Sequence, residues 1–255
     1  MALKEEFEKS GIWLFRHRSH LPLLVLGVGA VMVIRTEVYP ETFILEETPY
    51  EIYFEMFCLM VSIFGLAIRI FTVGYTPPNT SGRNVKGQVA ESLNTTGIYS
   101  AVRHPLYLGN FFMWLGIALL TGSLWFVIAF ILFYSIYYER IMFAEEQFLS
   151  KKFGIAYDTW ASRTPAIIPS FRKFEPAGAK FNWKKVLKKE KNGLLAVFLI
   201  FAMFDVIGEL IEHREDFNYF LMLMMLFSTL LYFIVKLLRK HTSLLQEEML
   251  SQNQA

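Results

Sequence analysis

The chain is 255 residues long and 54% of them are hydrophobic, a larger apolar share than an ordinary soluble domain carries. Its formal net charge of +2 is too small to indicate a nucleic-acid partner, and its single cysteine, Cys58, cannot form an intramolecular disulfide. The apolar residues gather into runs that approach the roughly 20 residues a helix needs to cross a bilayer. We therefore expect an all-α integral membrane protein that folds as a single membrane domain over residues 1–255.

The first two apolar runs predict the first two of about six transmembrane helices. The run from Leu21 to Ile34 is short for a crossing, but it can be extended backward through Trp13 and Phe15 or be tilted at the interface. The run from Ile52 to Val73 is long enough on its own. Its Arg69 lies near one end, where a long side chain can reach lipid headgroups.

Two helical hairpins are predicted further along the chain. The stretch from Leu106 to Tyr138 is longer than one crossing needs, and Thr121-Gly122-Ser123 interrupts it midway, which favours two helices joined by a tight turn. Leu194 to Ile207 and Phe217 to Val235 are separated by a polar stretch and predict the second hairpin.

The distribution of positive charge assigns the loops to sides of the membrane. The opposite loops are acidic, and Arg214 is the only lysine or arginine between their acidic residues. Because lysine and arginine are enriched in cytoplasmic loops, the basic side and both termini should be cytoplasmic, and a bacterial inner membrane is the expected location. The residues on the basic side are Arg16, Arg18, Arg83, Lys86, Arg103, Arg140, Lys151, Lys152, Lys184, Lys185, Lys188, Lys189, Lys191, Lys236, Arg239 and Lys240.

Two polar stretches on the cytoplasmic side, Gly74 to Pro105 and Glu139 to Gly193, are where a water-soluble cofactor would have to bind. The second begins with a helical pattern that continues the fourth span, and Gly154 is a plausible end for that helix. We therefore expect a cytosolic cofactor-binding helix and loop beneath the helical hairpin.

The densest group of unusual residues runs from Gly97 to Asn110, with the sequence GIYSAVRHPLYLGN. Pro105 suits the first turn of a helix, so Arg103 and His104 should stand at the helix start, where an anion can dock. Gly109 has poor helix propensity, which indicates close approach by a ligand or by a neighbouring helix. An ordinary interfacial turn, with an arginine for headgroups and a capping histidine, explains the same residues equally well.

Glu145 and Glu146 are adjacent on the predicted cytosolic helix and should point in different directions. Either could accept hydrogen bonds from vicinal ribose hydroxyls, although a solvated helix face is the simpler interpretation. The segment from Phe153 to Pro165 mixes aromatic residues with an arginine and, taken alone, is typical of an interfacial clamp.

Together, GIYSAVRHPLYLGN and the later AEEQFLSKKFGIAYDTWASRTPAIIP resemble the isoprenylcysteine carboxyl methyltransferase family and its phospholipid methyltransferase relatives. Those proteins share Arg-His-Pro-x-Tyr-x-Gly, a Glu-Glu pair, Phe-Gly-x-x-Tyr and a proline-ended loop, and the resemblance runs from about Gly97 to Pro169. It implies an S-adenosylmethionine-dependent enzyme with a core at residues 52–170. The first span and an additional hairpin at 194–235 are left unexplained.

The resemblance also implies roles for particular residues. It assigns Arg103, His104 and Glu146 to catalysis. Cofactor binding would fall to Gly97, Tyr99, His104, Tyr107, Leu108, Gly109, Glu145 and Glu146. It implies no metal ion. Candidates for contact with the substrate are Arg83, Asn84, Gln88, Asn94, Tyr157 and Arg163.

The acceptor is expected to be a membrane lipid. Arg83, Arg103 and Arg163 favour an anionic one, because arginine pairs well with phosphate or carboxylate, although ordinary headgroup binding would also explain them. The polar stretch from Thr80 to Thr96 resembles the bacterial branch that O-methylates the 1-phosphate of lipid A, and a polar loop that caps the cofactor is the alternative interpretation. Phosphatidylethanolamine N-methylation, prenylcysteine carboxyl O-methylation and a non-enzymatic transporter or structural protein are competing hypotheses.

Overall fold

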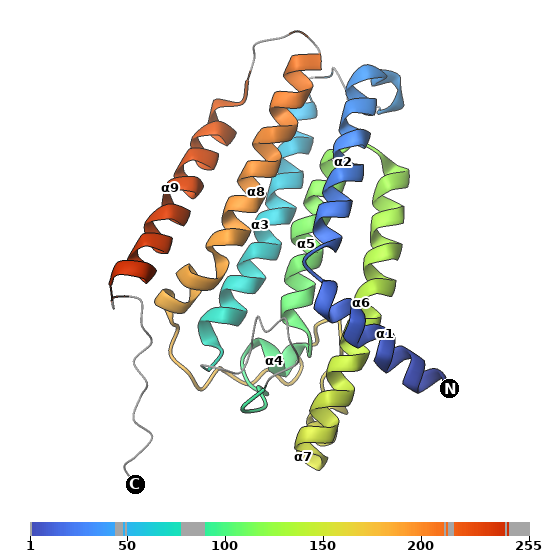
Figure 1. Ribbon diagram of the computed structural model, residues 1–255, viewed down its shortest axis with the longest axis vertical. Coiled ribbons are helices and arrows are strands. Elements are labelled where there is room, and N and C mark those ends of the chain that lie inside the picture. The colour runs from blue at the N-terminus through green and yellow to red at the C-terminus, as the bar shows by residue number, and fades with distance from the viewer. Residues whose placement is uncertain are drawn as a thin grey trace.

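The computed structural model describes residues 2–43, 48, 50–77, 90–211, 213, 217–242 and 244, and the regular structure within them is entirely helical. The long helices run side by side in a bundle, and α1 lies across one end of it (Figure 1). In chain order the elements are α1 (Leu3–His17), α2 (Leu21–Val38), the 3₁₀ turn η1 (Pro40–Thr42), α3 (Glu51–Tyr75), α4 (Ile98–Ala101), α5 (Pro105–Leu120), α6 (Leu124–Phe153), α7 (Ile155–Ala161), α8 (Trp183–Ile211) and α9 (Tyr219–His241).

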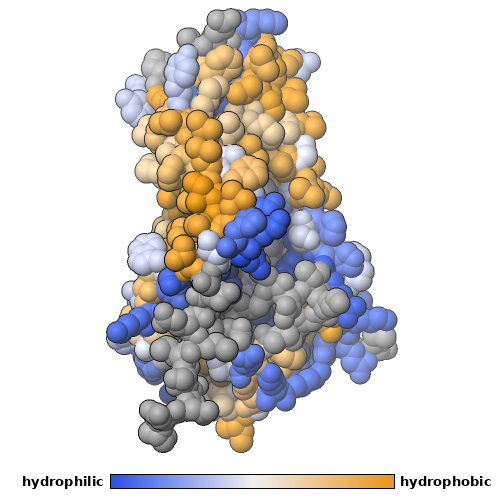
Figure 2. Space-filling view, turned by 60° about the vertical axis from the view of Figure 1, so that its left-hand side comes forward, coloured by the Kyte–Doolittle hydropathy of each residue, from blue (hydrophilic) through white to orange (hydrophobic). Residues whose placement is uncertain are grey.

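Four helices, α3, α6, α8 and α9, are long and apolar enough to cross a membrane, and the bent pair of α1 and α2 makes a fifth if it counts as one span. The remaining predicted crossing is α5, which is apolar but only 16 residues long. Hydrophobic side chains cover the upper part of the molecule and hydrophilic ones gather toward the lower end (Figure 2). The prediction of an all-α integral membrane protein is confirmed.

Of the two predicted ways to complete the first span, the straight backward extension is not the one observed. Instead of extending through Trp13 and Phe15, the helix breaks, and α1 is bent by 71° from the segment Pro22–Val38. Pro22 lies in the first turn of α2, where its missing N–H does no harm, but it could not lie inside a continuous helix. Phe15 is therefore buried beside α6, while Trp13 remains exposed.

The α5–α6 hairpin forms as predicted. Gly122 adopts φ 65° in the connecting turn, and the Ser123 hydroxyl caps α6 by accepting a hydrogen bond from Phe126 N at 3.4 Å. The helix then continues for 30 residues and ends at Gly154, which has φ 54°. Both glycines occupy left-handed backbone positions that other residues rarely adopt. The fourth span therefore continues as one helix that is longer than a crossing needs.

Helices α3 and α5 pack backbone to backbone. A Cβ atom on Gly116 would collide with Ser62 of α3, and one on Gly65 would collide with the backbone of α5. The Ser62 hydroxyl donates to Met113 O at 2.8 Å and adds a polar contact between the two helices. This close approach fixes where α5 begins and thus where the Arg-His-Pro motif lies.

The second predicted hairpin forms, but its first helix begins eleven residues earlier than predicted, at Trp183. The lysine-rich segment assigned to a loop is the first part of α8. Lys185 is buried there and donates to Thr76 O at 2.5 Å and Pro77 O at 3.0 Å at the end of α3. The helix is stabilised at this end by such contacts with its neighbours rather than by lipid.

Arg69 also differs from expectation, because it does not extend to the headgroups. Its Nε and Nη2 donate to the two carboxylate oxygens of Glu190 at 2.8 Å each, and its Nη1 donates to Asn110 Oδ1 at 2.7 Å. A planar guanidinium suits such a two-pronged contact with a carboxylate. The ion pair joins α3 to α8 and α5 near the lower end of the bundle.

Candidate functional site

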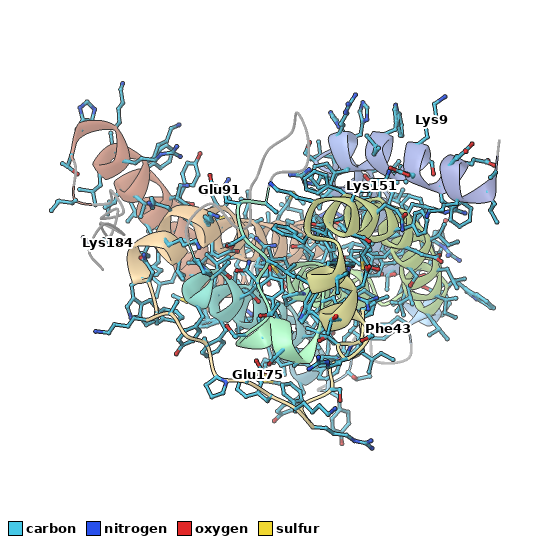
Figure 3. The ribbon with its side chains drawn as sticks, turned by 90° about the horizontal axis from the view of Figure 1, so that it is seen from below. Lys9, Phe43, Glu91, Lys151, Glu175 and Lys184 are labelled. Atoms are coloured by element: carbon cyan, nitrogen blue, oxygen red, sulfur yellow. The ribbon has the colours of Figure 1, made fainter. Side chains whose placement is uncertain are left out.

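The Arg-His-Pro motif lies between α4 and α5, where it pairs with the segment that follows α7. Arg103 N donates to Pro165 O at 2.9 Å, and His104 N donates to Ala166 O at 3.3 Å. Pro105 is the first residue of α5. Seen from below, α4 and α7 lie beneath the ends of the long helices, with α1 to one side and α8 and α9 to the other (Figure 3).

Glu146 holds both charged residues of the motif. One of its oxygens accepts from Arg103 Nε and from His104 Nε2, each at 2.9 Å. Arg103 Nη1 also donates to the carbonyl oxygens of Ala161 at 2.7 Å and Thr164 at 3.0 Å. These contacts tie α6, the motif and the end of α7 into one network, so the arginine and histidine have fixed positions.

Glu145 points another way, as the helical spacing predicts. Its Oε2 accepts from the Tyr107 hydroxyl at 3.0 Å and lies 3.8 Å from His104 Nδ1. The backbone oxygen of Tyr107 in turn accepts from the Tyr134 hydroxyl at 2.7 Å. The two carboxylates therefore contact opposite nitrogens of one imidazole ring, and His104 itself is buried.

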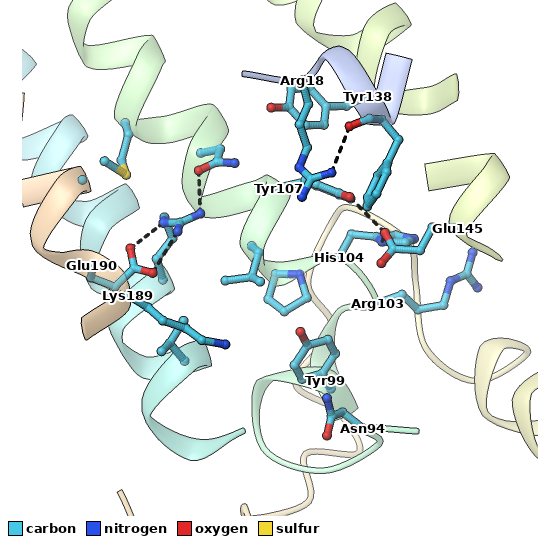
Figure 4. Close-up of a pocket in the computed structure, with 18 of the residues that line it drawn as sticks. Arg18, Asn94, Tyr99, Arg103, His104, Tyr107, Tyr138, Glu145, Lys189 and Glu190 are labelled. Atoms are coloured by element: carbon cyan, nitrogen blue, oxygen red, sulfur yellow. Dashed lines mark hydrogen bonds and ion pairs between the residues drawn. The ribbon is translucent and has the colours of Figure 1, made fainter. Parts of the chain in front are cut away.

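A cavity of about 580 Å³ opens beside this network, large enough for a cofactor-sized molecule (Figure 4). Residues from the α1–α2 bend and from α3, α5, α6, α7, α8 and the segment around α4 line it. Seven of the residues singled out from the sequence are among them: Asn94, Tyr99, Arg103, His104, Tyr107, Glu145 and Tyr157.

Other candidate residues do not line the cavity. The Cα of Gly109 faces α3, and a Cβ there would lie 2.6 Å from Arg69 Cγ and 2.8 Å from Gly65 O. Of the two explanations for this glycine, the neighbouring helix is the one that the structure supports. Arg163 is exposed on the surface and does not line the cavity. Gly97, Leu108 and Glu146 also lie outside the lining, and Arg83, Asn84 and Gln88 lie outside the described residues.

Sequence reasoning missed several polar residues of the cavity wall. Asn110 ended the quoted motif without a role, Arg69 was assigned to headgroups, and Lys189 and Glu190 were assigned to a loop. Arg18 was used only to orient the chain in the membrane. A helical pattern through the lysine-rich segment was the available signal for the α8 residues.

Two tyrosine hydroxyls outside the spans are held in their neutral form. Burial raises the pKa of Tyr99, and the Glu145 carboxylate raises it further. Burial likewise raises the pKa of Tyr157, with a further increase from Glu146. Tyr157 is only 4% exposed, and its hydroxyl is the one buried side-chain polar atom of the described residues without a hydrogen-bond partner. Such a group is costly unless something else bonds to it.

Fold and site together define a multi-span membrane protein with a cofactor-sized cavity at one end, lined by both polar and apolar residues. Over residues 57–156 the chain matches the family model described as phospholipid methyltransferase. This match confirms the resemblance drawn from the sequence to the phospholipid methyltransferase relatives. The match covers α3 to the start of α7 and leaves α1, α2, α8 and α9 outside it.

Three curated relatives match parts of the chain. The nickel-cobalt-cadmium resistance protein NccN of Alcaligenes xylosoxydans xylosoxydans is 34% identical over 90 residues, 35% of this chain and 42% of that protein. The cobalt-zinc-cadmium resistance protein CzcN of Cupriavidus metallidurans is 31% identical over 111 residues, 44% of this chain and 50% of that protein. The protein-S-isoprenylcysteine O-methyltransferase of Schizosaccharomyces pombe is 37% identical over 78 residues, 30% of this chain and 33% of that protein.

The chain thus spans half or less of the length of each of these relatives. Comparison with the solved structures finds no match.

Proposed function

We propose that this protein transfers a methyl group from S-adenosylmethionine to a membrane lipid. The observation that carries the proposal is the cavity that joins the Arg-His-Pro motif and Glu145 to the orphaned hydroxyl of Tyr157. The family match over residues 57–156 supports it, as does the O-methyltransferase activity for which the fission-yeast relative is named.

The lining residues fit S-adenosylmethionine. The Glu145 carboxylate would accept from its ribose hydroxyls or its ammonium group, and the neutral Tyr157 hydroxyl would donate to it. Tyr99 and Trp160 offer aromatic surface in the same cavity, and Asn94 offers an amide for the purine. A ligand of this kind would satisfy the polar atom that the protein leaves unbonded.

The bound cofactor would supply a sulfonium methyl group, whose carbon–sulfur bond breaks as an acceptor lone pair forms the new bond, with the electron pair remaining on the neutral thioether. The protein mainly aligns the two reactants and excludes water. His104 has a fixed orientation between the two carboxylates for that purpose. An ionised phosphate or carboxylate oxygen needs no proton removed, whereas an ammonium acceptor would need His104 or Glu145 as a base.

The length of α5 supports a site near the membrane boundary. Sixteen helical residues extend about 24 Å, only slightly less than the roughly 30 Å of a typical hydrocarbon core. A crossing helix of this length would have both ends close to the headgroups, and His104 stands at the start of α5. A headgroup can reach such a site without leaving the bilayer.

We infer that the favoured acceptor is the 1-phosphate of lipid A, methylated at the cytoplasmic leaflet of a bacterial inner membrane. The resemblance behind this choice lies largely in residues 80–89, outside the described ones, so it depends on the sequence. Phosphatidylethanolamine and prenylcysteine carboxylates are the alternative acceptors. The basic residues at the cavity end support a cytoplasmic orientation of that end and of both termini.

The test is incorporation of labelled methyl into a total lipid extract by the purified protein, followed by mass spectrometry of each lipid class. We expect one added methyl group on the 1-phosphate of lipid A. Labelling of phosphatidylethanolamine alone would replace this acceptor, and no labelled lipid together with no binding of S-adenosylhomocysteine would refute the activity.

A topology measurement tests the orientation. A cysteine placed at the exposed Arg172, below the cavity, should react with an impermeant reagent only from the cytoplasmic side. The native Cys58 is buried and should stay silent. Reaction from the outside would place the cavity beyond reach of the cell's methyl donor.

A further inference from the structure

Much of the cavity wall comes from parts of the chain outside residues 57–156, which match the family model and are called the family segment below. Helix α8 contributes both polar and apolar residues to it, and the α1–α2 bend contributes a second group from the other side. The α8 residues are Lys189, Glu190, Asn192, Gly193, Ala196, Val197 and Ile200, and those of the bend are Phe15, Arg16, Arg18, Ser19 and Pro22. Helices that the family segment lacks thus complete the cavity.

The ion pair between Arg69 and Glu190 fixes α8 against this wall. Both oxygens of Glu190 are occupied by the guanidinium, and its side chain is only 4% exposed. The same guanidinium is held by Asn110 of α5. Because the pair is locked from three helices, Lys189, the next residue along α8, has a defined position, and its side chain extends into the cavity toward Tyr99 and His104 (Figure 4).

The described lining carries more positive than negative charge: five cationic side chains, Arg16, Arg18, Arg69, Arg103 and Lys189, against two carboxylates, Glu145 and Glu190. Arg69 is neutralised by Glu190, and Arg103 by Glu146 just behind the wall. Lys189 of α8 and Arg16 and Arg18 of the α1–α2 bend bring further positive charge to the lining. A sulfonium cofactor is itself cationic, so this excess suits the other reactant.

Arg18 is held on the side of the cavity that α1 provides. Its Nη1 donates to Phe15 O at 2.9 Å, and its guanidinium lies 3.9 Å from the centre of the Phe15 ring. Deeper in the cavity, α8 and α5 present apolar side chains, including Met113, Ile117 and Val197. Cationic groups therefore lie near the headgroup level, with apolar surface beyond them.

We infer that Lys189, together with Arg18, binds the anionic headgroup of the lipid acceptor, and that the apolar wall of α5 and α8 receives the adjoining apolar part. The inference rests on the proposed methyl transfer and goes beyond it, because it assigns acceptor selection to helices outside the family segment. Lys189 is a specificity-determining residue in this view. The phosphate or carboxylate of the acceptor is the group that it contacts.

Steady-state kinetics of the full-length protein in vesicles test the inference, with lipid A vesicles and total lipid extract as probes. In Lys189→Met the KM for the lipid should rise about 10-fold or more, because a charged hydrogen bond is lost. The KM for S-adenosylmethionine and the binding of S-adenosylhomocysteine should change less than about 2-fold. Lys189→Arg should retain most of the lipid affinity, since it keeps the charge.

Lys184→Met is the matched control, because Lys184 is exposed on the same helix and does not line the cavity. If Lys189→Met and Lys184→Met have the same lipid KM while the wild type is active, the inference is wrong and the proposed function stands. If the wild type methylates no lipid at all, both the inference about Lys189 and the proposed function are wrong. An equal rise in the KM for lipid and for cofactor would also overturn the assignment, since it would indicate a general distortion of the cavity.

Discussion

The two ends of the bundle each contain a cavity, and the two cavities carry opposite charge. The one beside His104 has an excess of cationic side chains. The other, of about 460 Å³, lies between α2, α3, α8 and α9 at the opposite end, and no lysine or arginine is found among its described lining residues. Its carboxylates are Glu37, Glu51, Glu55, Asp205 and Glu209, set among phenylalanines.

The difference indicates that only one end is suited to an anionic headgroup. Like charges at close range in a partly buried site repel strongly, so a phosphate would be disfavoured in the acidic cavity. At the other end, Glu146 and Glu190 are each paired with an arginine, and cationic side chains outnumber carboxylates in the described lining. The comparison therefore predicts that substitutions at the two ends will have unequal effects on methyl transfer.

The largest effect is expected for Glu146→Gln. The amide keeps the shape of the side chain but loses the charge that holds Arg103 and His104, so both motif residues should move. A displacement of about 1 Å in an aligned site can cost about 100-fold in rate, and we expect a loss of at least this order. The measurement is the initial rate of methyl transfer at saturating cofactor and lipid.

Glu139→Gln is the control for this variant, because Glu139 is exposed on the same helix, about two turns earlier. Its rate should equal that of the wild type within about 2-fold. Equal rates for Glu146→Gln and Glu139→Gln would mean that the network around His104 does not align the reactants.

The next largest effect is expected on stability, for alanine substitutions of one glycine at each end of the bundle. In Gly109→Ala the new methyl group would meet Gly65 O and the Cγ of Arg69, whose far end is held by Glu190. Neither neighbour yields easily, so we expect a loss of about 1–3 kcal/mol and a lower Tm in detergent.

Gly208→Ala is the matched variant at the acidic end. There the methyl group would meet Glu37 Oε1 at 2.8 Å, the far end of a flexible side chain that can move aside. The loss should be below about 1 kcal/mol, since alanine also favours the helix. A larger loss at Gly208 than at Gly109 would show that the tighter helix contact is not at the motif end.

A smaller effect on binding is expected for Tyr157→Phe. Removal of a buried hydroxyl without a partner should leave stability unchanged or slightly increased. If the hydroxyl bonds to the cofactor, affinity for S-adenosylhomocysteine should fall about 3- to 10-fold, as measured by calorimetry.

Tyr134→Phe provides the contrast, because the Tyr134 hydroxyl already donates to Tyr107 O at 2.7 Å. Its loss should cost about 1 kcal/mol of stability with little change in cofactor affinity. The cofactor assignment would be contradicted if Tyr157→Phe were the less stable variant and bound S-adenosylhomocysteine like the wild type.

Features that depend on local chemistry were predictable from the sequence. Gly122 and Gly154 mark the turn and the end of a helix because both positions require positive φ, and Pro105 marks a helix start. The divergence of Glu145 and Glu146 follows from helical spacing alone. These residues predicted the hairpin, the extension of α6 and the position of the motif.

Features that depend on distant partners were not predictable. Arg69 and Glu190 are 121 residues apart, and nothing near either residue indicates the other. Lysines at the start of α8 resemble a loop by charge, although their contacts with α3 make them helical. Arg163, selected for its residue type, lies exposed and away from the cavity.

The smallest effect is expected for Glu209→Gln. This variant tests most directly whether the two cavities differ in their role. Glu209 lines the acidic cavity, on the same helix as Lys189 but at its other end. If the acceptor binds only beside His104, the loss of one charge at the far end should change kcat and both KM values by less than about 2-fold, since the two positions lie roughly 30 Å apart along α8 and the Coulomb energy falls with distance. The measurement uses the same vesicles as for Lys189→Met. A clear rise in the KM for lipid would mean that the acceptor reaches both ends, and the assignment of opposite roles to the two cavities would then be wrong.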